Sequence, residues 1–244
     1  MDKDELLERY EALGEESDFL AAKPLFEAEL REREERGQPD AEVFRQYGYL
    51  LHCHGRIAIR HAIDAYERSI ALNPGNDKAR AMWIGAKAEL EEEEHAVTLY
   101  RERVAAAPGD VRELRLLARA YLAARDFDAA RPVIDEGLAL APDDNVLICD
   151  RADVKAARGD PEGALADWRR ARELDPGPGN MGPVYSTAFL LEREGRLAEA
   201  AESWEQIIDG CDAEGWELTA VWPRQELQRL RGLLAAMNKT DPDR

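Results

Sequence analysis

The sequence is poor in cysteine, in aromatic residues and in basic charge, and each shortage excludes a class of protein. Its three cysteines, Cys53, Cys149 and Cys211, are far apart and odd in number, so they provide no disulfide framework. We therefore expect reduced thiols, as in a cytoplasmic protein. Aromatic residues make up only 7% of the chain, whereas alanine is abundant. This balance favours closely packed helices over a β-sandwich.

Basic residues are greatly outnumbered by acidic ones, which leaves a formal net charge of −18. A surface of that charge repels nucleic-acid phosphates and anionic lipids. The chain also lacks an apolar run of about 18 residues, the length that a membrane-spanning helix needs. The first residues, MDKDELLERYEALG, have neither the basic start nor the apolar stretch of a secretory signal. We expect a cytoplasmic protein that binds neither nucleic acid nor membranes.

The motifs of common enzymes are missing as well. The sequence contains no glycine-rich phosphate loop, no nucleophile elbow and no His-Glu-x-x-His segment. Carboxylates are plentiful, but a catalytic carboxylate needs a dry pocket that shifts its pKa. We therefore predict that the protein is not an enzyme and needs no cofactor.

Four prolines recur at a fixed interval of 34 residues, at Pro74, Pro108, Pro142 and Pro176. They lie in near-copies of one phrase: ALNPGN, AAAPGD, LAPDD and ELDPG. A period of this length is typical of helical repeat arrays. Proline stops an α-helix because it lacks a backbone N–H and its ring clashes with the preceding turn. Each proline is thus predicted to follow the second helix of a repeated helix pair.

Other positions keep the same phase relative to these prolines. Twelve residues before each proline there is an alanine, eight before there is a large residue, and five before the residue is small in three cases of four. A small residue lets two helices approach closely, and a bulky one fills the adjacent groove. The alanines are Ala62, Ala96, Ala130 and Ala164. The large residues are Tyr66, Tyr100, Ile134 and Trp168, and the residues five before the prolines are Ser69, Arg103, Gly137 and Ala171.

This repeating pattern resembles the tetratricopeptide repeat family, clearly over residues 41–176 and more weakly to about residue 211. In the weaker part, EREGRLAEAAESWEQII keeps the register through Ala200 and Trp204, but Asp212 occupies the proline position. A degenerate unit also precedes the clear repeats, since DFLAAKPLFEAEL (18–30) is similar to DFDAARPVIDEGL (126–138).

The resemblance implies an all-α fold, a right-handed superhelical solenoid of antiparallel helix pairs, in which we name the first helix of each pair A and the second B. We expect an N-terminal degenerate repeat or cap (1–40), four regular repeats (41–176), a fifth, divergent repeat (177–211) and a C-terminal capping helix with a tail (212–244). The expected helices are 3–13, 18–36, 41–54, 58–72, 77–90, 94–106, 111–124, 127–140, 145–158, 161–174, 183–194, 197–209 and 223–237.

Three places depart from the regular pattern. Two residues are inserted after the sequence HCH (52–54), between the helices of the first clear repeat. In the second repeat, ELEEEEHA replaces the glycine that otherwise marks the turn between the helices. In the fourth, Arg151 and Lys155 fall where helix A normally offers apolar side chains. Either their aliphatic stems reach outwards or the local register differs.

In the tetratricopeptide repeat family the A helices line a concave groove in which partner peptides usually lie, so the resemblance implies a groove here. Residues that recur at i, i+3 and i+7 on each A helix are its candidates. In the second repeat the register is ambiguous by one residue, so Lys78, Met82 and Trp83 all remain possible. The candidates for the other repeats are Arg45, Tyr49, His52, Arg112, Arg115, Arg119, Asp153, Tyr185 and Phe189, with Cys149, Asp150 and Glu192 beside them.

Two interpretations of the arginine stripe remain open. Arg112, Arg115 and Arg119 have the guanidinium geometry that binds carboxylates of a partner segment. They are equally suited to pairing with Asp150 and Asp153 on the next A helix. Exposed pairs of that kind contribute only about 0–1 kcal/mol each. The first interpretation predicts a protein or peptide partner that bears a carboxylate.

Residues 52–61 gather three of the four histidines, and zinc prefers histidine and cysteine ligands. His52, His54 and His61, with Cys53 among them, are therefore candidate metal ligands. Against a metal site, His52 and His54 point about 200° apart on a helix. The partial negative charge at the end of helix A also favours histidines there without a metal.

The function favoured by these residues is that of a non-catalytic interaction module that binds a peptide or protein segment in the groove. A metal-binding or metabolite-sensing accessory protein of a biosynthetic enzyme is the alternative. The sequence specifies neither the partner nor the oligomeric state.

Overall fold

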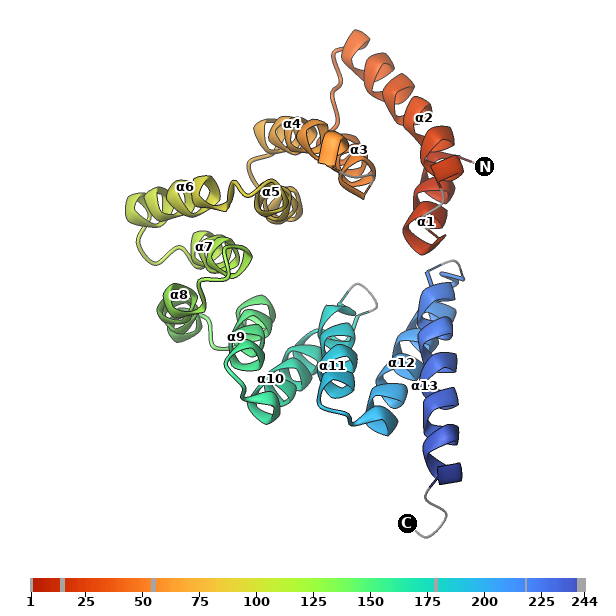
Figure 1. Cartoon of the computed structure of the whole chain (residues 1–244). Coiled ribbons are helices and arrows are strands. Elements are labelled where there is room, and N and C mark those ends of the chain that lie inside the picture. Colours follow the sequence, from red (N-terminus) through yellow and green to blue (C-terminus); the bar gives the residue numbers. More distant parts are fainter. Residues whose placement is uncertain (1, 14–15, 54–55, 178–179, 218, 241–244) are drawn as a thin grey trace. The chain divides into compact units, whose positions relative to one another are not determined.

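The computed structural model describes residues 2–13, 16–53, 56–177, 180–217 and 219–240, and among these it contains α-helices and no β-strand. The chain divides into two compact units, Met1–Ala141 and Pro142–Arg244. Within each unit, successive helices pack against one another as antiparallel hairpins (Figure 1). None of the described helices combines the length and the apolar character needed to cross a membrane.

The helices lie where the repeat register predicts them, with ends that differ by only a few residues. The first unit contains α1 (Lys3–Leu13), α2 (Glu16–Glu35), α3 (Ala41–Cys53), α4 (Arg56–Leu72), α5 (Asp77–Glu89), α6 (Glu93–Ala106), α7 (Val111–Ala123) and α8 (Phe127–Leu140). The second contains α9 (Asn145–Ala157), α10 (Pro161–Leu174), α11 (Gly182–Arg193), α12 (Leu197–Glu214) and α13 (Val221–Thr240). The A helices are α3, α5, α7, α9 and α11, and α13 continues the alternation.

The recurring prolines set the ends of the B helices. Helices α4, α6, α8 and α10 each end two residues before one of them. Helix α12 has Asp212 in the proline position and therefore continues to Glu214, five residues beyond the expected end. It stops at Gly215, whose φ of 74° is the left-handed conformation that glycine adopts without strain.

The beginnings of three A helices repeat with the same period. Asn76, Asp110 and Asp144 precede α5, α7 and α9, and each side chain accepts a hydrogen bond from a backbone N–H of the first helical turn. Such a cap contributes about 1 kcal/mol, because it satisfies a donor that the helix itself leaves unpaired.

The turn between helices A and B requires a left-handed residue in four repeats. Gly159 and Gly195 adopt it with φ values of 82° and 76°, and Glu91 and Arg125 occupy the same place with φ values of 61° and 56°. The missing glycine in ELEEEEHA therefore changes the residue but not the geometry of the turn. The strain at the two non-glycine positions is offset by packing of the flanking helices.

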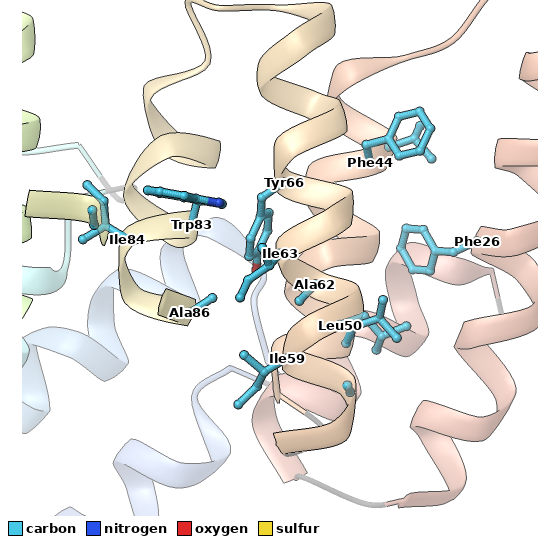
Figure 2. Packing of buried hydrophobic residues seen from close by; sticks show 14 of the residues in the cluster. Phe26, Phe44, Leu50, Ile59, Ala62, Ile63, Tyr66, Trp83, Ile84 and Ala86 are labelled. Carbon is cyan, nitrogen blue, oxygen red and sulfur yellow. The ribbon is translucent and has the colours of Figure 1, made fainter. Parts of the chain in front are cut away.

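The core consists of the phased residues. The recurring alanines Ala62, Ala96, Ala130 and Ala164 are fully buried, and so is Ala200 of the divergent repeat. The bulky residues eight positions before the prolines are buried beside them, which confirms the predicted packing. In the first unit, Phe26, Leu50, Tyr66 and Trp83 come from four different helices and join one cluster (Figure 2).

Arg151 and Lys155 form ion pairs inside their own repeat. Both bind the carboxylate of Asp167 on α10, with Nε and Nζ at 2.8 and 2.7 Å from the same oxygen. Burial raises the pKa of Asp167, but the hydrogen bonds from the two cations outweigh it and hold the pKa below its ordinary value. The predicted register is therefore correct, and a buried acid on helix B accommodates the two charged residues of helix A.

Helices α3 and α4 approach each other closely at Gly48. A Cβ atom there would lie 2.6 Å from Cε1 of Tyr66 and 3.2 Å from the carbonyl oxygen of Ala62. We expect Gly48→Ala to lower the free energy of unfolding by about 1–3 kcal/mol, because a well-packed core does not accept an extra methyl group. Chemical denaturation of the full chain measures this effect.

Gly85 on α5 is the matched control, because a Cβ at that helical position meets nothing within 4 Å. Gly85→Ala should leave stability unchanged or raise it by about 0.5–1 kcal/mol, since alanine is the better helix former. Equal effects of the two substitutions would contradict the packing described for Gly48.

Candidate functional site

The A-helix face of the first unit is the side of α3, α5 and α7 that carries Arg45, Met82 and Arg112. Arg45 forms hydrogen bonds with the carboxylate of Glu42, and its Nη1 lies 3.6 Å from the sulfur of Met82 on the neighbouring A helix. Trp83, the next residue, is buried in the core, and its indole N–H donates to Glu67 at 3.0 Å. In the second repeat, Met82 therefore contacts the neighbouring A helix, whereas Trp83 belongs to the core.

Arg112 is held within the first unit. Its Nε donates to Asp77 at 2.6 Å and its Nη2 to the carbonyl oxygen of Pro74 at 2.8 Å. The hydrogen bond to Asp77 raises the pKa of Arg112 further above its ordinary value. Arg112 therefore binds the preceding A helix, whereas the ion-pair alternative placed its partners, Asp150 and Asp153, on the following one.

Arg115 and Arg119 continue the same stripe of α7, and both are half-buried. Tyr49 on α3 is half-buried as well. The side chain of His52 lies outside the described residues. The sequence predicts six groove positions on α3 and α7, and the structure describes the side chains of five of them.

An ion pair joins α5 and α7 beneath this face. Arg80 and Glu113 are 3% and 9% exposed, and Nη1 of Arg80 donates to Oε1 of Glu113 at 2.9 Å. Arg103 of α6 lies 3.7 Å from the same oxygen. The pair links α5 to α7, the helix that carries Arg112, Arg115 and Arg119.

The A-helix face of the second unit carries an aromatic cluster, which we define as Tyr185, Phe189, Trp204 and Trp222. Trp204 makes edge-to-face contacts with the other three rings. Its ring centroid lies 5.7 Å from that of Tyr185, 5.4 Å from that of Phe189 and 5.1 Å from that of Trp222. The ring of Trp222 lies 6.0 Å from that of Tyr185 and 5.9 Å from that of Phe189. Distances and angles of this kind are those that aromatic pairs prefer.

The cluster has a buried base and an exposed top. Trp204 is fully buried, whereas Phe189 is 50% exposed and Trp222 is 37% exposed. Two large aromatic side chains thus remain accessible at one place, held from below by a third ring. Exposed apolar groups that adjoin in this way mark interaction sites more often than scattered ones do.

The sequence predicted Tyr185 and Phe189 for this face but missed Trp222. Helix α13, which we expect to be a C-terminal cap, contacts α11 through Trp222 and Arg229. Its phase carries the signal that was overlooked: Trp222, Glu226 and Arg229 recur at i, i+4 and i+7 and share one side of the helix. The role expected for Trp204, a core residue, is confirmed by its burial.

Carboxylates fix the indole rings beneath the second face. Glu192 accepts a hydrogen bond from the indole N–H of Trp204 at 2.9 Å and forms an ion pair with Arg229 of α13. Asp153 accepts one from the indole N–H of Trp168 at 3.2 Å. Asp153 thus holds a core tryptophan, a contact that the sequence did not predict.

The candidate metal ligands are only partly described. His61 is exposed on α4, His54 lies outside the described residues, and so do the side chains of His52 and Cys53. Throughout the part of the chain that the structure describes, no three His, Cys, Asp or Glu residues are grouped so that they could hold a metal ion.

Comparison with known proteins agrees with the helical pairs. A family model described as tetratricopeptide repeat matches residues 111–154, which comprise α7, α8 and most of α9. The chain is similar to the solved structure of a thermophilic TPR protein of Thermus thermophilus, with 20% identity, a TM-score of 0.58, and coverage of 78% of this chain and 98% of that chain.

A TPR protein of Parabacteroides merdae matches over 93% of both chains, with 16% identity and a TM-score of 0.48. MamA of Desulfovibrio magneticus matches over 71% of this chain and 96% of that one, with 17% identity and a TM-score of 0.45. No curated protein matches the chain. At these identities the likeness concerns the fold alone.

Proposed function

We propose that the chain, whose fold is similar to that of tetratricopeptide repeat proteins, binds a segment of a partner protein on its A-helix faces and has no catalytic role. The aromatic cluster of the second unit carries this proposal. Phe189 and Trp222 expose large rings that would otherwise be expected in a core. Burial of such rings against a partner supplies much of the binding energy of an interface.

The cluster is suited to holding a side chain because it is already rigid. Trp204 packs against all three other rings, and its indole N–H is fixed by Glu192. A preorganised surface loses little conformational entropy when a partner binds. We therefore place the main apolar anchor of the partner segment on Phe189 and Trp222.

The first unit offers a contact of a different chemistry. Its A-helix face carries Arg45, Arg112, Arg115 and Arg119, and guanidinium groups bind carboxylates with two parallel hydrogen bonds. A partner segment that bears Asp or Glu residues, or a terminal carboxylate, would complement this stripe. The acidic residues that now adjoin the arginines, among them Glu42 and Asp77, make this the weaker of the two contacts.

Partner capture from the native cell tests the aromatic anchor. The double variant Phe189→Ser, Trp222→Ser should capture at least about thirtyfold less of the partner than the original chain. This factor corresponds to about 2 kcal/mol of binding free energy, which is the cost of removing an interface hot spot. Affinity purification followed by mass spectrometry measures the loss. The unfolding midpoint of the variant shows whether its second unit remains folded.

Leu140→Ser is the matched control, because Leu140 is 54% exposed on the B helix α8 and far in sequence from the cluster. It should retain the partner.

The double variant Arg115→Glu, Arg119→Glu should reduce capture of an acidic partner segment by about tenfold. Undiminished capture by the folded aromatic variant would refute the proposed anchor.

A further inference from the structure

A cavity of about 370 Å³ lies between α10, α11 and α12 in the second unit. Its volume is within the range of sites that bind small molecules. None of the four rings of the aromatic cluster lines it, so it is separate from the surface proposed for the protein partner. It lies along the two B helices, with α11 contributing to its floor.

The floor of the cavity is apolar. Leu165 and Trp168 of α10 and Val184 and Leu191 of α11 line it, and each is at least nine-tenths buried. These side chains offer a ligand an indole face and branched aliphatic groups. An apolar ligand body of moderate size would gain about 25 cal/mol for each Å² that it buries there.

The α10 wall carries positive charge. Arg169 and Arg172 are three residues apart and so share one side of the helix. Nη1 of Arg172 is fixed by the carbonyl oxygens of Gly177 at 2.6 Å and Asn180 at 3.3 Å. Among the described residues, neither arginine forms an ion pair, so their charge is available to an anionic group of a ligand.

The α12 wall carries negative charge. Glu199 is occupied, because Arg196 binds both Glu199 and Glu162 at one end of the cavity. Glu202, one turn further along α12, forms no ion pair with any described residue. Glu173 also lines the cavity, but Nη1 of Arg170 lies 3.7 Å from its carboxylate.

We propose that this cavity binds a zwitterionic α-amino acid with a large apolar side chain. The carboxylate of the ligand binds Arg169 and Arg172, its ammonium group binds Glu202, and its side chain packs on Trp168 and Leu165. A simple carboxylic acid would leave Glu202 beside an apolar ligand, and a simple amine would leave the two arginines uncompensated. The proposal goes beyond the binding of a protein partner and does not depend on it.

Titration calorimetry with L-phenylalanine tests the proposal on the full chain. We expect saturable binding with a Kd of about 1 mM or lower, as suits a ligand of this size. We expect 3-phenylpropionic acid, which lacks the ammonium group, and phenethylamine, which lacks the carboxylate, to bind at least about tenfold more weakly. Equal binding of either analogue, or no saturation by phenylalanine up to about 10 mM, would overturn the proposal.

Substitutions then locate the binding. Arg169→Ala should weaken phenylalanine binding about tenfold, whereas Arg193→Ala, which removes an exposed arginine of α11 outside the lining, should leave it unchanged. Thr187→Trp should abolish binding by filling the cavity from α11. Unchanged affinity of Arg169→Ala would place the ligand elsewhere and overturn the proposal, even where Thr187→Trp fails to fold.

Discussion

Replacement of Trp204 with alanine is expected to lower the free energy of unfolding of the second unit by about 3–5 kcal/mol. Trp204 is fully buried, it contacts the three other rings of the aromatic cluster, and its indole N–H binds Glu192. Alanine leaves a cavity the size of an indole and removes a hydrogen bond from a carboxylate. Denaturation followed by circular dichroism and tryptophan fluorescence measures the loss.

Trp222→Ala separates the contribution of the core from that of the surface. Trp222 belongs to the same cluster but is 37% exposed, so its removal should cost no more than about 1–2 kcal/mol. In partner capture the order should be reversed. Trp222→Ala should lose more of the partner than Trp204→Ala, when each variant is assayed at a temperature below its unfolding transition. If Trp222→Ala destabilises as much as Trp204→Ala, the accessible top of the cluster is wrongly described.

The second large effect is expected at the buried ion pair of the first unit. Glu113→Leu leaves the guanidinium of Arg80 buried at 3% exposure and without its carboxylate, which should cost about 3–5 kcal/mol. Chemical denaturation of the full chain, monitored at several wavelengths, measures this cost. The expected loss exceeds that of an exposed pair such as Arg131 with Asp135 on α8, which contributes about 0–1 kcal/mol at most.

The double variant Arg80→Met, Glu113→Leu provides the control. Apolar residues of similar volume remove both charges, so most of the stability lost in Glu113→Leu should return. A double variant as unstable as the single one would show that the cost arises from packing and not from an uncompensated charge. A single variant as stable as the original chain would show that Arg80 reaches water.

The repeat period predicts the fold because the residues that define it act locally. The proline after each B helix, the capping side chain before an A helix and the recurring alanine each act on the chain immediately around them. The helix ends therefore agree with expectation nearly everywhere. At Asp212 the same rule explains the deviation: without its proline, α12 runs on to Gly215.

The ion pairs between different helices were less predictable from the sequence. Arg112 binds Asp77 on the preceding helix, and Arg151 and Lys155 converge on Asp167. Each of these cations had several acids within reach of its flexible stem, and the sequence does not rank them. Glu91 adopts a positive φ because the flanking helices impose it, which a local propensity for glycine does not reveal.

In the candidate functional site, too, the sequence predicts what one helix carries but not which helices meet. The phase of α11 predicts Tyr185 and Phe189 for one face, but it does not predict Trp222, which reaches them from α13. The cavity along α10 and α12 arises from three helices at once and has no motif in the sequence. Such sites follow from packing, so a pattern along one helix predicts only part of their lining.

The most direct test of the account is a photocrosslinking measurement with the captured partner. A photoreactive phenylalanine analogue at Phe189, on the A-helix face, is compared with the same analogue at the exposed Leu140 of α8. If partners bind on the A-helix faces, the partner becomes covalently attached from position 189 and not from position 140. Attachment from position 140 alone would contradict the claim that partners bind on the A-helix faces.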